Sequence, residues 1–75
     1  MQWIAELARR AGPIAAGNYR VVVVAPDGNA TWEDFTTLEP AHRYAEDAAS
    51  EEDGPLAYVL DSEFNLIERG SHYAT

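Results

Sequence analysis

The 75-residue chain contains no cysteine and no lysine, and its longest apolar run spans only residues 21–26. Without cysteine, the chain can form neither disulfides nor the thiolate sites that hold structural zinc. A run of this length falls far short of the roughly 20 residues that a membrane-spanning helix needs. Residues 1–12 carry Glu6 and no basic cluster ahead of their apolar residues, so we expect no signal peptide there.

The charge of the chain is strongly unequal, because 13 acidic residues oppose five arginines for a net charge of -8. Residues 1–20 carry three arginines and one glutamate, whereas residues 27–68 carry twelve acids and one arginine. Such a surplus repels nucleic-acid phosphates and anionic membranes and attracts basic surfaces. We therefore expect no direct nucleic-acid or membrane partner. The expected partner is a basic protein, which can itself be one that binds nucleic acid.

The length and the 47% hydrophobic content predict one small globular domain. Its parts are an N-terminal helix in 1–12, a connection over 13–18, a core over 19–70 and a tail over 71–75. The apolar residues of the first helix follow the spacing of one helical face: Ile4, Leu7, Ala8 and Ala11. We expect this helix to dock loosely on the core, or to dock on a partner.

Residues 19–25 contain four consecutive valines, which favour a strand. The unbroken run predicts a strand covered on both faces, or covered on one face with the other face in an interface. Turn residues 26–29 lead into a second strand over 31–36. Trp32 and Phe35 would lie on opposite faces of a regular strand, so we expect a bulge or bend near Glu33 and Asp34.

The second helix is predicted to begin at Thr36 or Thr37, with a capping box that includes Glu39, and to be closed by the acids at 51–53. Strands over 56–61 and 66–69, joined by a turn, complete the order α-β-β-α-β-β. We therefore expect an α+β fold in which two hairpins form an antiparallel four-stranded sheet. The second helix packs on one face of this sheet, and residues 71–75 form a frayed tail.

The sequence contains no arrangement typical of catalysis or metal binding. It has no Gly-x-Ser-x-Gly motif, and His42 and His72 are interpreted as surface residues. Residues 27–29 resemble the start of a calcium loop, but the glycine comes too early and no glutamate occupies the twelfth position. We expect no enzyme activity, no catalytic residues, no metal and no cofactor. A small enzyme or ligand-binding domain would need a pocket lined by His42 and acids.

The acids of the second helix and its neighbours form the candidate site. Acids one turn apart lie about 5–6 Å from each other at Cβ, similar to successive phosphates, so a row of them can imitate a nucleic-acid backbone. The expected partner-binding residues are Glu33, Asp34, Glu39, Glu46, Asp47, Glu51, Glu52, Asp53, Asp61 and Glu63. If the acids serve only solubility or tolerance of salt, the chain is instead an interaction module or homo-oligomer. That module would use the strand Val21–Val24 or the N-terminal helix.

An acidic helical segment over 37–47 lies between two predicted hairpins, in a small chain without a catalytic arrangement. In size, charge and architecture over residues 19–70, the chain resembles phage-encoded anti-CRISPR and anti-restriction proteins, several of which imitate DNA. The resemblance implies an inhibitor that occupies the recognition groove of a Cas complex subunit and blocks its target DNA. It implies action in the cytoplasm of a bacterial host, and we expect a monomer rather than a dimer.

Overall fold

The computed structural model describes residues 2–51 and 53–69. The elements in chain order are α1 (Gln2–Arg9), β1 (Tyr19–Val24), β2 (Ala30–Phe35), α2 (Leu38–Ala48), β3 (Leu56–Leu60) and β4 (Leu66–Arg69). This order and the single antiparallel four-stranded sheet confirm the predicted α+β fold. The predicted tail over 71–75, with His72, lies outside the described residues.

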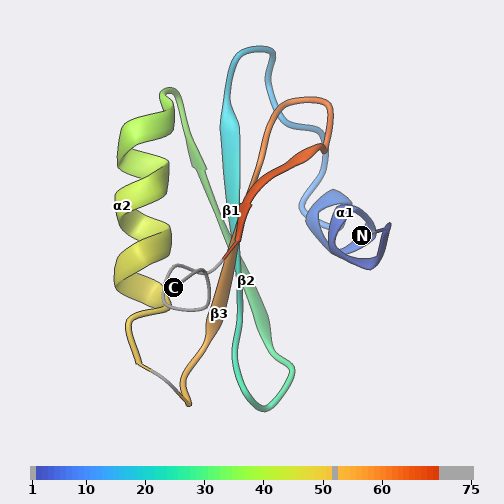
Figure 1. Ribbon diagram of the computed structural model, residues 1–75. Helices are drawn as coiled ribbons and strands as arrows, with labels where there is room; N and C mark the ends of the chain where they lie inside the picture. Colours follow the sequence, from blue (N-terminus) through green and yellow to red (C-terminus); the bar gives the residue numbers. More distant parts are fainter. Residues whose placement is uncertain (1, 52, 70–75) are drawn as a thin grey trace.

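The strands of the sheet lie in the order β2-β1-β3-β4, so β1 and β3 are interior and β2 and β4 are the edges. All neighbouring strands are antiparallel. Figure 1 shows α2 on one side of the sheet and α1 on the other. Because β1 has a strand on each side, the valine strand offers no open edge to another chain.

Each face of the sheet has its own apolar core. The α2 core contains the buried residues Val21, Ala41, Ala45, Ala49, Ala57 and Val59. The α1 core contains the buried residues Ile4, Ala8, Val22, Tyr58 and Leu60. Successive strand residues point to opposite faces, so the valine run supplies both cores. Of the two interpretations of this run, the structure supports the strand covered on both faces.

β2 is a regular strand, so the predicted bulge near Glu33 and Asp34 is wrong. All six residues of β2 pair with β1 in continuous register. Trp32 packs against the α1 core and Phe35 against the α2 core. A bulge would be needed only if both aromatic side chains entered one core, whereas this sheet has a core on each face. The irregularity in the sheet occurs instead between β3 and β4.

The N-terminus of α2 has no capping box, contrary to the prediction. Thr37 is the N-cap residue and has extended backbone angles, but its side chain makes no capping hydrogen bond. The carboxylate of Glu39 pairs with Arg43 on the next turn, at 3.3 Å, instead of reaching back to the cap. The helix therefore begins at Leu38 through its backbone and the packing of its apolar face.

The C-terminus of α2 lies at Ala48, before the acids that were expected to close the helix. The backbone N–H of Ala49 donates to the carbonyl of Ala45 at 3.0 Å and caps the last turn. Glu51 and Asp53 follow in the loop that leads to β3. These two acids therefore lie beyond the helix and not within its last turn.

Candidate functional site

The side of α2 turned away from the sheet carries exposed charges of both signs. Glu39 Oε2 lies 3.3 Å from Arg43 Nη2, and Glu46 Oε2 lies 3.3 Å from His42 Nε2. Exposed pairs one turn apart are worth only about 0.3–0.5 kcal/mol, so they add little to the stability of the helix. Asp47 is exposed and has no ion pair among the described residues. The predicted row of acids on this helix is therefore interrupted by one arginine.

The acids of the α2–β3 loop continue this side of the molecule. Glu51 and Asp53 are exposed, and neither forms an ion pair within residues 2–51 and 53–69. The carbonyl of Glu51 accepts a hydrogen bond from the N–H of Gly54 at 3.1 Å, which fixes a tight turn. Backbone contacts thus shape the loop and leave both carboxylates to solvent. Glu52, the third predicted acid here, lies outside the described residues.

The adjacent acids Glu33 and Asp34 lie on opposite faces of β2. Glu33 pairs across the sheet with Val21, which belongs to the α2 core, whereas Asp34 pairs with Arg20. Residues directly opposite each other on neighbouring strands share a face. Only Glu33 can therefore lie on the same side of the sheet as the acids of α2.

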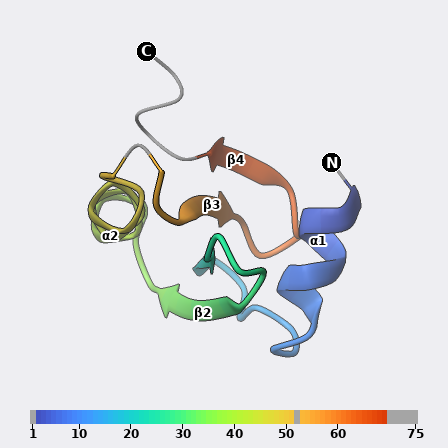
Figure 2. The same ribbon diagram turned by 90° about the horizontal axis from the view of Figure 1, so that it is seen from below.

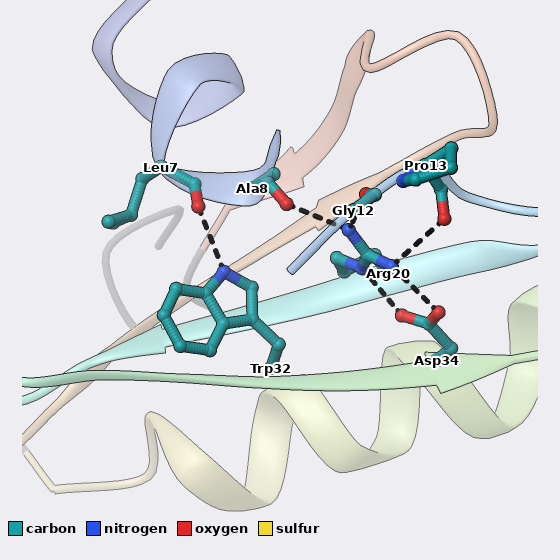
Figure 3. A network of polar contacts seen from close by, with 7 residues as sticks. All are labelled: Leu7, Ala8, Gly12, Pro13, Arg20, Trp32 and Asp34. Atoms are coloured by element: carbon teal, nitrogen blue, oxygen red, sulfur yellow. Dashed lines mark hydrogen bonds and ion pairs between the residues drawn. The ribbon is translucent and has the colours of Figure 1, made fainter. Parts of the chain in front are cut away.

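Asp34 is held by a buried arginine on the α1 side of the sheet (Figure 3). Arg20 is 3% exposed, and its Nε and Nη2 donate to the two carboxylate oxygens of Asp34 at 2.6 and 2.9 Å. Its Nη1 donates to the carbonyls of Ala8 and Gly12 at 2.7 and 2.6 Å, and its Nη2 to that of Pro13 at 3.3 Å. A buried guanidinium is tolerated only when its donors are satisfied in this way. Asp34 therefore helps to fix α1 and the chain after it to the sheet.

Further contacts join α1 to the same side of the sheet. The indole Nε1 of Trp32 donates to the carbonyl of Leu7 at 3.0 Å (Figure 3). The guanidinium of Arg9 lies 4.8 Å from the ring centroid of Phe64, in the turn between β3 and β4. The sequence interpretation assigned no role to Arg20 or to the indole of Trp32. The sequence feature that points to a buried arginine is the position of Arg20, a charged residue directly before four valines.

Asp61 and Glu63 lie in the turn between β3 and β4, on the α1 side of the molecule (Figures 1 and 2). The carboxylate of Asp61 accepts the backbone N–H groups of Glu63 and Asn65, both at 2.9 Å, and the side-chain amide of Asn65 at 3.3 Å. The bond from the Asn65 backbone contributes most to holding the pKa of Asp61 below its ordinary value, against a smaller opposing effect of desolvation. Asp61 thus organises a turn, and neither acid lies with those of α2.

The structure therefore divides the predicted acids into two groups. Those on the α2 side, called here the α2-side acids, are Glu33, Glu39, Glu46, Asp47, Glu51 and Asp53. Among the described residues, no three histidines or acids are grouped to hold a metal ion, and neither helix is long and apolar enough to cross a bilayer. Comparison of the chain with protein-family models, curated proteins and solved structures found no match.

Proposed function

We propose that the protein is a non-enzymatic binding protein whose α2-side acids contact a basic surface on a partner that handles nucleic acid. The observation that carries this proposal is the group of exposed carboxylates on the α2 side, in contrast to Asp34 and Asp61 on the α1 side. On the α1 side, Asp34 is bound by a buried arginine and Asp61 by the backbone of a turn. On the α2 side, the carboxylates of Asp47, Glu51 and Asp53 are exposed and without ion pairs in the described residues. Charges that folding does not engage are available to a partner.

The chemistry of these acids favours a cationic groove over a small ligand. A net charge of -8 accelerates encounter with a basic surface. Glu39 and Glu46 lie about two helical turns apart, and Asp47 follows Glu46 directly, so these exposed carboxylates present negative charge along the helix and can occupy contacts that a nucleic-acid backbone would make. Several of the anti-CRISPR and anti-restriction proteins that the chain resembles imitate DNA in this way. The proposed partner is accordingly a Cas complex subunit or a similar nucleic-acid-binding protein in a bacterial cytoplasm.

The alternative, an apolar interaction module, has less support. The strand Val21–Val24 is interior, and the apolar face of α1 is occupied by its own sheet, where Ile4 and Ala8 are fully buried. Trp3 is 48% exposed and contacts the ring of Tyr58 edge-on, with centroids 5.5 Å apart. One half-exposed indole is a small apolar area for an oligomer interface.

The proposal is tested by capture from a nucleic-acid-rich bacterial lysate on the immobilised protein, with release by double-stranded DNA. The variant Asp47→Lys/Glu51→Lys reverses two α2-side acids. The matched control, Glu6→Lys/Glu63→Lys, makes the same change in net charge at exposed residues elsewhere. We expect a basic nucleic-acid-binding protein to be captured by the native chain and the control and lost by the α2-side variant.

Salt and DNA supply the second readout of the same experiment. Screening should weaken the complex as ionic strength rises from about 0.05 M to about 0.5 M, because the Debye length falls severalfold. DNA should displace the captured protein. Capture that resists both salt and DNA, or that both variants lose equally, would contradict the proposal.

A further inference from the structure

The two edges of the sheet differ in how well they are protected. β4 has only four residues, and its pairing with β3 contains a register shift. β2 has six residues in continuous register and contains no proline. Short strands, bulges, prolines and charged side chains, lysine above all, keep sheet edges from pairing with other chains. β2 has no bulge, proline or lysine, and neither helix lies beyond it (Figure 2); its charged residues are the acids Glu33 and Asp34, which repel an acidic strand and attract a basic one.

The β1–β2 hairpin fixes which backbone groups of β2 are unpaired. The N–H of Ala25 donates to the carbonyl of Asn29 at 2.7 Å, and that of Gly28 donates back to Ala25 at 2.9 Å. Gly28 has a φ of 95°, the left-handed conformation that closes a three-residue hairpin loop. Ala25 and Asn29 are therefore a hydrogen-bonded pair. From them, hydrogen-bonded and non-hydrogen-bonded pairs alternate along the ladder.

The alternation divides the residues of β2 into two sets. Those whose backbone groups bond to β1 are Thr31, Glu33 and Phe35. Those whose N–H and C=O groups point away from the sheet are Ala30, Trp32 and Asp34. Within the described residues, no backbone hydrogen bond outside the sheet involves residues 30–35. The free edge of β2 thus presents three N–H donors and three C=O acceptors, at the spacing that the backbone of an added strand would match.

A strand added to this edge would bond to the backbone of Trp32 and Asp34. Its side chains on the α2 side would then lie opposite Glu33 and Phe35, in the closer, non-hydrogen-bonded positions with Cβ atoms about 4.5–5.5 Å apart. Glu33 is exposed and has no ion pair in the described residues. Phe35 contacts the ring of Tyr44, with centroids 5.4 Å apart, and Tyr44 is 39% exposed.

α2 lies over the α2-side face of the same edge. Since Tyr44 contacts Phe35, the flank of α2 that carries Tyr44 faces β2. Asp47 follows Tyr44 by three residues and so lies about 60° farther round the helix, toward the side turned away from the sheet. One carboxylate that is unpaired among the described residues, that of Glu33, therefore shares a face of the open edge with the Phe35–Tyr44 pair.

We propose that the free edge of β2 binds an extended basic segment of a protein partner by strand addition. Backbone bonds to Trp32 and Asp34 give affinity, and a lysine or arginine of the segment lies opposite Glu33. An apolar residue two positions away lies opposite Phe35. This inference depends on the proposed function for its basic partner and adds the mode of binding.

Charge argues against a second copy of the chain as the occupant. Antiparallel pairing of two β2 edges, with Trp32 against Asp34, would place the two Glu33 side chains directly opposite each other. Like charges in that position are destabilising. Every register would also join two chains that each carry a net charge of -8.

The test is amide hydrogen exchange, followed by NMR, with a blocked peptide of alternating arginine and valine as the probe. The amides of Trp32 and Asp34 should exchange rapidly in the free protein and about tenfold more slowly with saturating peptide. Those of Thr31, Glu33 and Phe35 should be protected already by β1. Peptides with glutamate in place of arginine, or glycine in place of valine, should leave all five unchanged. Protection confined to α2, or protection that grows with protein concentration alone, would overturn the proposal.

A pair of protein variants tests the charge contact. Glu33→Arg should weaken binding of the arginine–valine peptide about tenfold. Glu6→Arg makes the same change in net charge and should weaken this binding less than about twofold. Equal weakening by the two variants would overturn the assignment of Glu33. If lysate capture requires Asp47 and Glu51 while β2 gains no protection from the peptide, strand addition fails and the proposed function stands. If the peptide protects β2 while no basic protein is captured, the proposed function fails and the edge site stands.

Discussion

On the α1 side, a buried arginine and the backbone of a turn bind the carboxylates of Asp34 and Asp61, whereas on the α2 side the carboxylates of Asp47, Glu51 and Asp53 extend into solvent. Arg20 satisfies Asp34 and three carbonyls on the first side. The second side is attached through small buried residues such as Ala41 and Ala45. The comparison indicates that charge on the α1 side serves folding. We expect the charge on the α2 side to contribute little to folding, because its ion pairs are exposed.

The largest expected effect is the loss of the arginine that joins α1 to the sheet. Arg20→Leu should lower the free energy of unfolding by about 3 kcal/mol, because it leaves three carbonyls and a carboxylate without their donor. The matched control is Arg43→Leu on α2, where the arginine is 72% exposed and should contribute less than about 0.5 kcal/mol. Urea unfolding measures both. Equal losses would remove the distinction between the two sides.

The next effect comes from the indole that binds the end of α1. Trp32→Phe keeps an aromatic ring in the α1 core but removes the donor to the Leu7 carbonyl. The free energy of unfolding should fall by about 1 kcal/mol. The control is Trp3→Phe. Trp3 is half-exposed and makes no hydrogen bond in the described residues, so its replacement should lower the free energy of unfolding by less, measured in the same experiment. A larger loss at Trp3 would show that burial of the rings, and not the hydrogen bond, attaches α1.

The turn at Asp61 predicts a dependence of stability on pH. Because the folded pKa of Asp61 is lowered, its contribution is complete above the unfolded pKa and is lost as pH falls through the folded pKa. The destabilisation caused by Asp61→Ala should therefore shrink as the pH falls from neutral to acid. Asp61→Asn, which keeps an acceptor oxygen but cannot ionise, should remove the same dependence. Unfolding measured across this pH range checks the sign, and a penalty that grows toward acid would contradict it.

The smallest expected effect is neutralisation of the unpaired acids on the α2 side. Asp47→Asn, Glu51→Gln and Asp53→Asn should each change the free energy of unfolding by no more than about 0.5 kcal/mol. Fewer like charges should, if anything, stabilise the fold. Thermal unfolding of the three single variants measures the effect. A loss above about 1 kcal/mol at any of them would mean that these acids have a structural role.

The fold could be predicted from the sequence because its signals are local. The valine run and the turn at Pro26–Asn29 each restrict their own segment. The existence of two cores could not be predicted from local pattern, since it depends on α1 folding back over the sheet. The prediction of a bulge in β2 was wrong for the same reason: it assumed one core, whereas Trp32 and Phe35 pack against different cores.

The sequence predicts which acids of α2 are exposed, but not how the acids of the candidate site lie relative to one another. The exposure of Glu39, Glu46 and Asp47 follows from helical spacing. Neighbouring strand residues point to opposite faces, so Glu33 and Asp34 separate in any strand, but which of them lies on the α2 side depends on strand register. The neutralisation of Asp34 by Arg20 depends on a contact between residues 14 positions apart. Tertiary pairing of this kind leaves no periodic signal in one sequence.

The central claim is that the α2-side acids are required by a partner and not by the fold. The most direct measurement follows partner capture and unfolding free energy together for Asp47→Lys/Glu51→Lys and for Glu6→Lys/Glu63→Lys. The account predicts two stably folded proteins, of which only the second still captures a basic nucleic-acid-binding protein that DNA displaces. Undiminished capture by the first, or its failure to fold, would contradict the account.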